Sequence, residues 1–231
     1  MRLLIIPDLH HHIENAEYWL RTQKYDRVLF LGDYFDDFED NVNDARKTAS
    51  WLRQRIEHTD DIFLLGNHDA AYMFPDDPRF YCPGFTRAKA KGISEILFAK
   101  HWQRFELVHA EGNWLFSHAG YHPSWVEGLS VPHIVARAEA LMRKARRHVI
   151  DPIFGVGLDR GGAGPYFGGP LWLDWNNLAP IAGINQVVGH TQSDDVRSKI
   201  TRESRNYCLD VGNGRAAAIL FEGEELSILE R

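Results

Sequence analysis

Three short apolar segments in the first third of the chain each end abruptly at polar residues. They span residues 3–6, 27–31 and 62–65 and are rich in Leu, Ile, Val and Phe. Continuous apolar runs of this length are typical of strands that are buried on both faces. Helix-like stretches separate them, and one of these, residues 42–56, places apolar residues at spacings of three and four. This alternation predicts parallel strands joined by right-handed helical crossovers.

The remainder of the chain predicts a second group of strands. Residues 106–110 and 114–117 are typical of a hairpin, and residues 131–149 are predicted to form a helix. The glycine-rich residues 150–170 are predicted to form a loop. Further strands are expected at residues 186–188, 197–201, 206–210, 215–221 and 225–229. We therefore predict an α/β fold with two mixed β-sheets packed together and flanked by helices. No linker is evident, so residues 1–231 are expected to form a single domain.

Composition restricts the range of partners and locations. The 231 residues are 44% hydrophobic and 25% charged, with a formal net charge of −6, so charge does not indicate nucleic-acid binding. The apolar run at the N-terminus is too short for a signal peptide or a membrane span, and no membrane partner is expected. Cys82 and Cys208 fit a reducing compartment, which favours a cytoplasmic location. Neither has a visible activating base, so a thiol nucleophile is not expected.

Polar clusters follow the predicted strands, at the sheet edge where open α/β sheets bind ligands. In chain order they are Asp8-Leu9-His10, Gly32-Asp33-Tyr34-Phe35-Asp36, Gly66-Asn67-His68-Asp69, Ser117-His118-Ala119-Gly120 and Gly189-His190-Thr191-Gln192. Carboxylates and neutral imidazoles are suitable ligands for Mn, Fe or Zn. The preceding glycines permit tight turns just past a strand. One cluster would be weak evidence, but all of them together predict a metal site in a single pocket.

These motifs, in this order, resemble those of the calcineurin-like metallophosphoesterase superfamily, and the resemblance extends from Asp8 to about Asp210. It implies a phosphoesterase with two divalent metal ions, for which Mn²⁺ is favoured and Fe, Zn or Ni would also serve. Carried over residue by residue, the resemblance assigns the first metal to Asp8 and His10, a bridging position to Asp33, and the second metal to Asn67, His118 and His190.

The resemblance also implies a catalytic pair, His68 and Asp36. His68 would act beside the substrate as general acid or electrostatic stabiliser, and Asp36 would hydrogen-bond to it and orient it. Two metals about 3.5–4 Å apart can clamp the phosphoryl oxygens and lower the pKa of a bridging water, which then attacks phosphorus as hydroxide. Because an alkoxide is a poor leaving group, a positioned acid typically contributes about 10²–10⁴-fold.

One departure from the common pattern of the superfamily concerns the first metal. Gln192 stands where many members have a second histidine, so this metal is expected to keep more water ligands and to bind more weakly. The protein-phosphatase branch also lacks that histidine. Segments 169–172 and 209–212 resemble the same branch.

A second departure concerns phosphate binding. The protein-phosphatase branch has Arg-Gly after the second acidic residue of its Gly-Asp-x-x-Asp motif, whereas Asp37 and Phe38 follow here. Arg160, in the glycine-rich segment, is a candidate to bind the substrate phosphate instead, because a guanidinium suits bidentate contact. A solvated loop arginine is an equally open interpretation. Asn67 is a further candidate for substrate binding.

We expect hydrolysis of phosphate monoesters in the manner of protein phosphatases. The alternative is a phosphodiesterase or nucleoside-polyphosphate hydrolase on the same dinuclear site. A non-catalytic scaffold is less favoured, since His68 and six candidate ligands are all present. The substrate would be a phosphorylated small molecule, a nucleotide or a phosphoprotein. His11 and His12, which follow the first motif, are expected to be surface imidazoles, and the alternative is that they flank the pocket.

Overall fold

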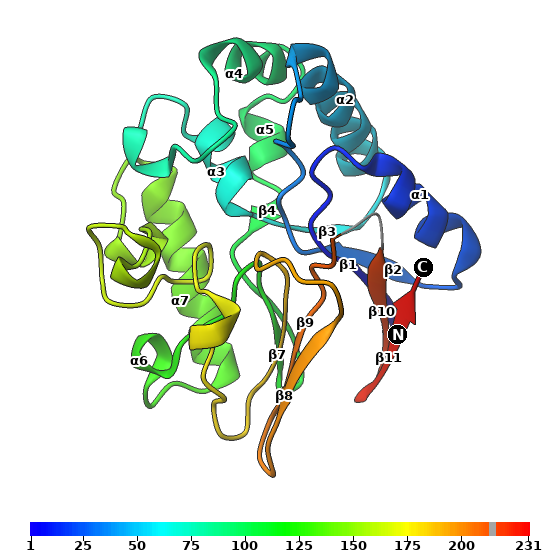
Figure 1. Ribbon diagram of the computed structural model, residues 1–231, viewed down its shortest axis with the longest axis vertical. Coiled ribbons are helices and arrows are strands. Elements are labelled where there is room, and N and C mark those ends of the chain that lie inside the picture. The colour runs from blue at the N-terminus through cyan, green and yellow to red at the C-terminus, as the bar shows by residue number, and fades with distance from the viewer. Residues whose placement is uncertain (213–215) are drawn as a thin grey trace. The chain divides into compact units, whose positions relative to one another are not determined.

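The computed structural model describes residues 1–212 and 216–231, which form two compact units (Figure 1). The first unit contains Met1–Phe105 and Ala218–Leu229, and the second contains Glu106–Ala217 and Glu230–Arg231. Each unit has one mixed β-sheet, and helices flank the sheets. This confirms the predicted α/β class with two mixed sheets. A single domain over residues 1–231 stays a prediction.

The first unit is built on a six-stranded sheet with the order β11-β10-β1-β2-β3-β4. Its central strands pair in parallel as predicted, with Leu4 opposite Val28 and Leu29 opposite Ile62. β10 joins the other side of β1 in antiparallel orientation, with Leu220 opposite Leu4. The strands are β1 (Arg2–Ile6), β2 (Arg27–Phe30), β3 (Ile62–Leu64), β4 (Phe105–Glu106), β10 (Ala217–Glu222) and β11 (Glu225–Glu230).

Helices connect the parallel strands of the first unit. α1 (Ile13–Thr22) follows β1, and α2 (Val42–His58) follows β2. α2 begins where the Asn41 side chain accepts the N–H of Asn43 at 2.8 Å, which satisfies one backbone donor of the first turn. Its buried residues have the predicted spacing of three and four; they are Ala45, Thr48, Ala49, Leu52 and Ile56. After β3 come α3 (Asn67–Met73), the 3₁₀ helix η1 (Pro78–Phe80), α4 (Arg87–Ser94) and α5 (Ala99–Trp102).

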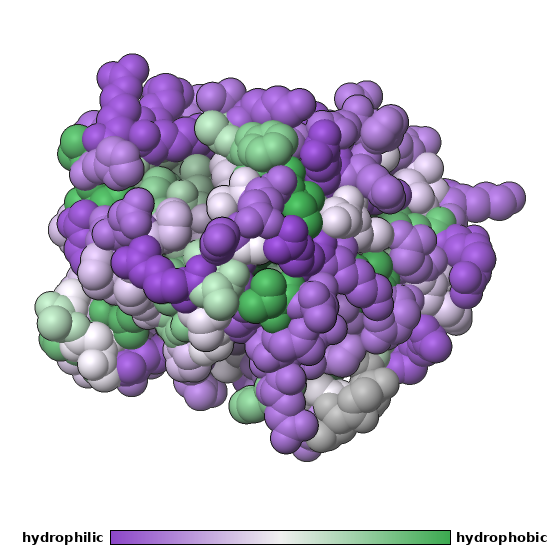
Figure 2. Space-filling model, turned by 90° about the horizontal axis from the view of Figure 1, so that it is seen from above, coloured by the Kyte–Doolittle hydropathy of each residue, from purple (hydrophilic) through white to green (hydrophobic). Residues whose placement is uncertain are grey.

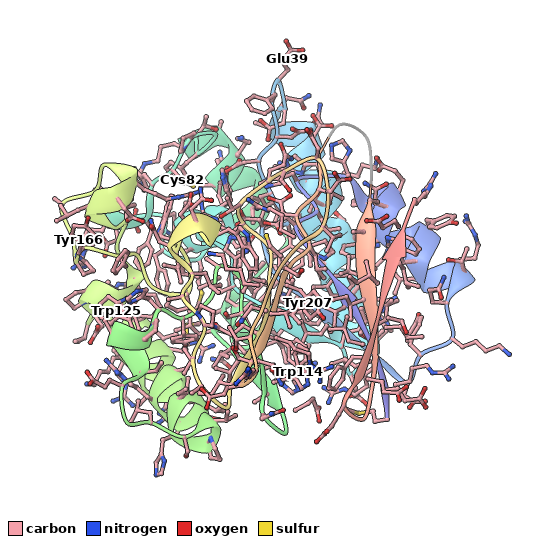
Figure 3. The ribbon with its side chains drawn as sticks, turned by 60° about the horizontal axis from the view of Figure 1, so that its bottom comes forward. Glu39, Cys82, Trp114, Trp125, Tyr166 and Tyr207 are labelled. Carbon is pink, nitrogen blue, oxygen red and sulfur yellow. The ribbon has the colours of Figure 1, made fainter. Side chains whose placement is uncertain are left out.

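The second unit contains a five-stranded sheet with the order β5-β6-β7-β9-β8. Its strands are β5 (His109–Glu111), β6 (Trp114–Phe116), β7 (Asn185–Val188), β8 (Arg197–Ile200) and β9 (Arg205–Cys208). β5 and β6 form the predicted hairpin, while β6, β7 and β9 run parallel, so their carboxyl ends share one edge. Trp114 in β6 stacks on Tyr207 in β9 with ring centroids 6.2 Å apart (Figure 3).

Helices of the second unit lie mainly between β6 and β7 along the chain. They are α6 (Pro123–Val126), α7 (Val131–Ala145) and the 3₁₀ helices η2 (Pro152–Phe154), η3 (Leu158–Arg160) and η4 (Trp175–Asn177). The predicted helix 131–149 ends earlier, at Ala145, and His148 has a positive φ of 62° that is incompatible with its continuation. The predicted loop 150–170 contains η2 and η3. Asp151 caps η2 by accepting the N–H of Ile153 at 3.1 Å.

Two predicted strands differ from the observed ones. The segment 106–110 is divided, because Glu106 ends β4 of the first sheet and His109 begins β5 of the second. Residue 215, at the start of the predicted strand 215–221, lies outside the described residues, and the strand is observed from Ala217 to Glu222.

Hydrophilic residues cover most of the face shown in Figure 2, with small hydrophobic patches between them. Within the described part of the chain, no helix combines the length and the apolar character needed to cross a membrane.

Candidate metal centre and catalytic pair

The turns that follow β1 and β2 are bonded to each other through their backbones. The N–H groups of Leu9 and His10 both donate to the carbonyl oxygen of Asp33 at 2.9 Å. His10, Asp33 and Asp36 have positive φ angles of 42°, 49° and 65°. Residues other than glycine adopt this conformation only where their surroundings impose it, and such strain clusters at functional sites. The turns therefore hold candidate site residues in defined, strained positions.

Asp8, His10 and Asp33 form a candidate metal-binding cluster in the first unit. One ligand atom from each lies within 4.8 Å of the others, and His10 Nε2 is 3.8 Å from Asp33 Oδ2. His10 Nδ1 lies 2.5 Å from the backbone carbonyl oxygen of Asp36. A carbonyl oxygen only accepts, so Nδ1 carries the proton and Nε2 keeps its lone pair for a metal. Two carboxylates and one correctly oriented imidazole fit a divalent cation such as Mn, Fe or Zn.

Asp69 joins the turns after β2 and β3. Its carboxylate is fully buried and accepts the N–H groups of Asp33 at 2.8 Å, Tyr34 at 2.9 Å and Gly66 at 2.9 Å. These charge-assisted bonds fix Asp33 relative to α3. The approach is close enough to require glycine at position 66, because a Cβ there would lie 2.1 Å from Asp33 Oδ1. Sequence reasoning gave Asp69 no role, although an acidic residue three positions after a helix start is a recognisable signal.

His68 and Asp36 form the candidate catalytic pair in the first unit. His68 Nδ1–H donates to Asp36 Oδ2 at 3.0 Å, and the backbone N–H of His68 donates to Asp33 Oδ1 at 2.9 Å. The side chain of His68 is 19% exposed, whereas that of Asp36 is 2% exposed. Burial alone would lower the pKa of His68, but the charge of Asp33 and the hydrogen bond to Asp36 raise it above its usual value. Both partners stabilise the charged form of the imidazole.

The expectation that His11 is a surface imidazole is wrong. Its side chain is only 10% exposed, with Nε2 2.9 Å from Asp40 Oδ2 and Nδ1 2.8 Å from Thr48 Oγ1. Both ring nitrogens have polar partners, which makes its burial possible. His12 is 54% exposed and lies 3.2 Å from Asp37, so its predicted surface position is confirmed.

His118 and His190 come together in the second unit, after β6 and β7. His118 is fully buried, and its Nε2 lies 3.1 Å from His190 Nδ1. The Gly189 N–H donates to the His118 carbonyl oxygen at 2.8 Å, which joins the two loops, and His190 has a positive φ of 68°. Two nitrogens that bind one ion at about 2.0–2.1 Å lie roughly 3 Å apart. The spacing of the two nitrogens therefore fits adjacent positions on one metal. Arg160 Nη1 donates to Nε2 of His190, so Nδ1 carries the proton here and would release it to a metal.

Arg160 lies beside His190. Its Nη1 is 2.7 Å from His190 Nε2, and its Nε and Nη2 donate to Asp174 Oδ2 at 3.2 Å and 2.9 Å. Burial alone would raise the pKa of Asp174, but the Asn176 N–H and the Arg160 guanidinium hold it below its usual value. Asp174, which sequence reasoning did not single out, therefore anchors Arg160 as an ion pair.

The other positions singled out in the sequence are also defined. Asn67 is buried at the start of α3, and Asp37 lies 3.2 Å from His12 with a side chain that is 32% exposed. Gln192 is exposed and packs on Gly212, where a Cβ would lie 2.8 Å from its Cδ. The first three motifs thus belong to the first unit and the last two to the second. Their convergence in a single pocket stays a prediction.

The family model described as calcineurin-like phosphoesterase matches residues 1–194. Solved structures with a similar fold include a metallophosphoesterase from Sphaerobacter thermophilus, with a TM-score of 0.50, 15% identity, and coverage of 100% of this chain and 87% of that one. A protein-tyrosine phosphatase of a psychrophilic Shewanella species has a TM-score of 0.53 and 17% identity, covering 99% of this chain and 80% of its own.

A protein serine/threonine phosphatase from Saccharomyces cerevisiae has a TM-score of 0.54 and 15% identity, covering 100% of this chain and 79% of its own. At these identities the likenesses establish the fold alone. No curated protein matches the sequence. Because the family model spans most of the described residues, the chain belongs to the calcineurin-like phosphoesterase family and is a hydrolase acting on phosphoester bonds.

Proposed function

We propose that the protein hydrolyses phosphate monoesters, in the manner of a protein phosphatase. The observation that carries this proposal is the His68–Asp36 pair, hydrogen-bonded at 3.0 Å, with His68 bonded through its backbone to the candidate metal ligand Asp33. A partly exposed imidazole held beside a metal ligand is suited to protonating the oxygen of a leaving alcohol. Segments 169–172 and 209–212 add support through their resemblance to the protein-phosphatase branch.

The proposed cofactors are two divalent cations, with Mn²⁺ favoured. Asp8 and His10 would bind the first, Asp33 would bind both, and Asn67, His118 and His190 would complete the second. Family membership and the order of the motifs support this assignment, as do the donor atoms available in each unit. When bound, such cations supply Lewis-acid stabilisation of the phosphoryl oxygens and lower the pKa of the attacking water.

The roles of the protein's own residues follow from the atoms they have available. Because His68 donates Nδ1–H to Asp36, its Nε2–H is the group that would face the leaving oxygen. Arg160, fixed by Asp174, would bind the phosphate, because a guanidinium with two anchored nitrogens loses little conformational freedom on binding an anion. The buried amide of Asn67 would add a polar contact to the substrate.

The substrate would be a phosphorylated small molecule, a nucleotide or a phosphoprotein, and we propose that the enzyme acts in the cytoplasm. Full-length protein treated with chelator and then reloaded separately with Mn, Fe, Zn or Ni would be assayed with an aryl monophosphate, a bis-aryl phosphate and a dinucleoside polyphosphate. We expect metal-dependent turnover of the monophosphate. Turnover of the diester or the polyphosphate alone would overturn the monoesterase proposal.

A His68→Asn variant separates catalysis from metal binding. We expect it to retain the metal content of the wild type and to lose about 10²–10⁴-fold in kcat, because a general acid is removed while the ligands remain. Metal content would be measured by elemental analysis on the same samples. If the wild-type protein is inactive with every one of these metals, the result would instead favour a non-catalytic scaffold protein.

A further inference from the structure

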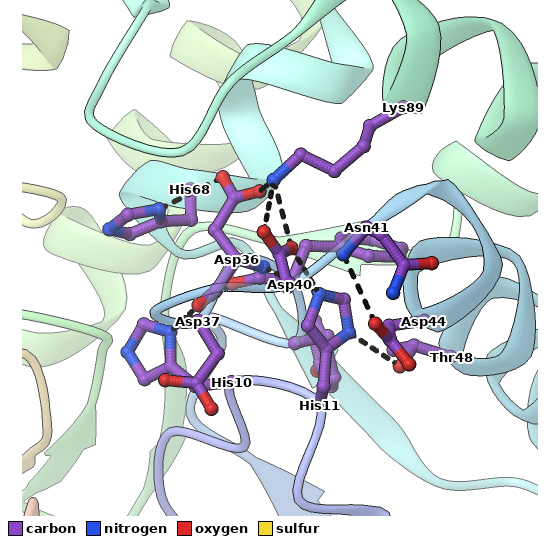
Figure 4. Close-up of polar contacts among 12 residues, drawn as sticks. His10, His11, Asp36, Asp37, Asp40, Asn41, Asp44, Thr48, His68 and Lys89 are labelled. Carbon is purple, nitrogen blue, oxygen red and sulfur yellow. Dashed lines mark hydrogen bonds and ion pairs between the residues drawn. The ribbon is translucent and has the colours of Figure 1, made fainter.

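The two oxygens of the Asp36 carboxylate have separate partners. Oδ2 accepts the Nδ1–H of His68 at 3.0 Å, whereas Oδ1 accepts the Lys89 ammonium at 2.7 Å (Figure 4). Oδ1 also accepts the Tyr72 hydroxyl. Rotation of this carboxylate would break contacts on both sides. Its orientation is therefore set by groups that lie away from the substrate-facing side of His68.

Lys89 is a buried cation between two carboxylates. Its side chain is 4% exposed, and Nζ also lies 2.9 Å and 2.8 Å from the two oxygens of Asp40. A buried ammonium is costly unless it is paired and hydrogen-bonded, and here it has anionic acceptors on both sides. Burial alone would lower the pKa of Lys89, but its hydrogen bonds to Asp36 and Asp40 raise it above its usual value. Lys89 is therefore charged.

The network around Lys89 is anchored in the fold. Asp40 Oδ2 lies 2.9 Å from Nε2 of the mostly buried His11 ring, and the other ring nitrogen of His11 lies 2.8 Å from Thr48 Oγ1 in α2. On the opposite side, Gly84 packs directly on Asp36, since a Cβ at this residue would lie 2.8 Å from Asp36 Cγ. The chain between α3 and α4 thus covers Asp36 and carries Lys89 to it.

We propose that Lys89 is a positioning residue for the catalytic pair. By fixing Oδ1 of Asp36, it keeps Oδ2 aligned with the Nδ1–H of His68 and so holds Nε2 toward the leaving group. Without the ammonium, the carboxylates of Asp36 and Asp40 would face each other inside the protein and repel, and Asp36 would rotate away from His68. This inference rests on the proposed role of His68 as general acid.

The first test uses leaving groups of different basicity on the metal-loaded, full-length enzyme. The para-nitrophenolate released from para-nitrophenyl phosphate is a weak base and needs little protonation to depart. The more basic phenolate released from phenyl phosphate depends on protonation by the general acid. For Lys89→Met we expect kcat with phenyl phosphate to fall about 10–100-fold, a range typical of residues that orient a reacting group, and a much smaller fall with para-nitrophenyl phosphate. KM and metal content should be unchanged. Equal losses on both substrates, or no loss, would overturn the proposal.

Lys91→Met is the matched control, because Lys91 lies on the same helix with its side chain exposed. It should match the wild type on both substrates. Should Lys89→Met fail to fold, the double variant Lys89→Met/Asp40→Asn serves instead, since it removes one charge of each sign. Measured against Asp40→Asn alone, we expect the double variant to show the selective loss with phenyl phosphate. A double variant with the wild-type ratio of the two rates would refute a positioning role.

A second measurement does not depend on turnover. NMR of the histidine ring nitrogens in zinc-loaded protein should show an Nδ1-bound proton on His68 that exchanges slowly, assigned by its loss in His68→Gln. In Lys89→Met, or in the double variant, this proton should exchange rapidly. If the Nδ1 proton of His68 still exchanges slowly in these variants, the proposal fails, even where the enzyme is active. If the wild type hydrolyses no phosphate ester, the proposed function fails, and the exchange rate still decides whether Lys89 positions His68.

Discussion

The two units differ in the balance of charged side chains that they contribute to the proposed chemistry. The first unit supplies a surplus of carboxylates. Among the described residues of this network, Lys89 is the one buried cation, and it is already paired with the carboxylates of Asp36 and Asp40. The second unit supplies imidazoles and a guanidinium, with one carboxylate bonded to that guanidinium. The residues are Asp8, His10, Asp33, Asp36, Asp40, His68, Asp69 and Lys89 in the first unit and His118, His190, Arg160 and Asp174 in the second. Attraction for cations thus resides mainly in the first unit and attraction for a phosphate in the second.

The units also differ in how firmly their turns are held. In the first unit, backbone hydrogen bonds join the turns after β1 and β2, and the buried Asp69 carboxylate ties the latter to α3. In the second unit, the loops of His118 and His190 share the hydrogen bond from Gly189 at 2.8 Å. The second unit has a buried anchor as well, but a neutral one, since the Tyr121 N–H donates to Gln186 Oε1 at 2.8 Å. Charge-assisted hydrogen bonds are the stronger ones, so substitutions in the first unit should disturb the site more.

The largest effect is expected from Asp33→Asn, compared with His190→Gln. Asp33→Asn removes a charge and the proposed bridging ligand, so it should abolish binding of both metals and lower kcat by more than about 100-fold, beyond the range typical of residues that only orient a ligand. His190→Gln should lose one metal. Metal content after equilibration with Mn²⁺ measures both. Asp37→Asn, which alters a partly exposed carboxylate beside His12, is the control. If the Asp33→Asn protein still binds two metal ions, Asp33 is not the bridging ligand, and the expected order of the two variants would be wrong.

The parts predicted from the sequence are those encoded locally. The apolar run 3–6 is buried throughout because it is a central strand, and parallel pairing follows from the alternation of strand and helix. The same alternation places Asp8 and Asp33 at one edge of the sheet. Residues with a suggestive local pattern, such as Gly66-Asn67-His68, could therefore be found without a structure.

The parts that could not be predicted depend on contacts between distant segments. Lys89 contacts Asp36 across 53 positions, and His11 contacts Thr48 across 37. A lysine beside alanines in a short helix gives no sign of burial, because lysine is almost never fully buried unless it is paired. In the sequence, His11 is simply the middle one of three consecutive histidines, and only the structure places Asp40 and Thr48 beside it. Tertiary structure decides these roles.

A second prediction uses glycine-to-alanine substitutions to compare how tightly the turns of the two units are packed. Gly66→Ala would place a methyl group 2.1 Å from Asp33 Oδ1 and 2.3 Å from its backbone nitrogen, so something must shift. We expect the free energy of unfolding to fall by about 3 kcal/mol or more, and Mn²⁺ affinity to fall with it, because Asp33 moves.

Gly112→Ala in the β5–β6 turn is the matched control. Gly112 has a φ of 59°. Apart from its chain neighbours, no described residue has an atom within 4 Å of the position that a Cβ would occupy, so only the cost of the left-handed conformation applies, about 1–2 kcal/mol. Metal affinity should not change. Urea unfolding and calorimetric Mn²⁺ titration measure the two effects. Equal losses of stability in both variants, with metal affinity intact, would show that the first unit is no more constrained than the second.

The smallest expected effect tests whether the second unit supplies the attraction for phosphate. Arg160→Met should raise both KM and the inhibition constant of inorganic phosphate roughly 10–100-fold, since a hydrogen bond to a charged group contributes about 1.5–3 kcal/mol. Arg160→Lys should recover only part of this loss, because an ammonium keeps the charge but not the bidentate geometry. Arg143→Met, which alters an exposed ion pair with Glu139, is the control. If phosphate inhibits Arg160→Met as strongly as the wild type, Arg160 serves only to hold Asp174 and His190, and the anion must be bound by other groups.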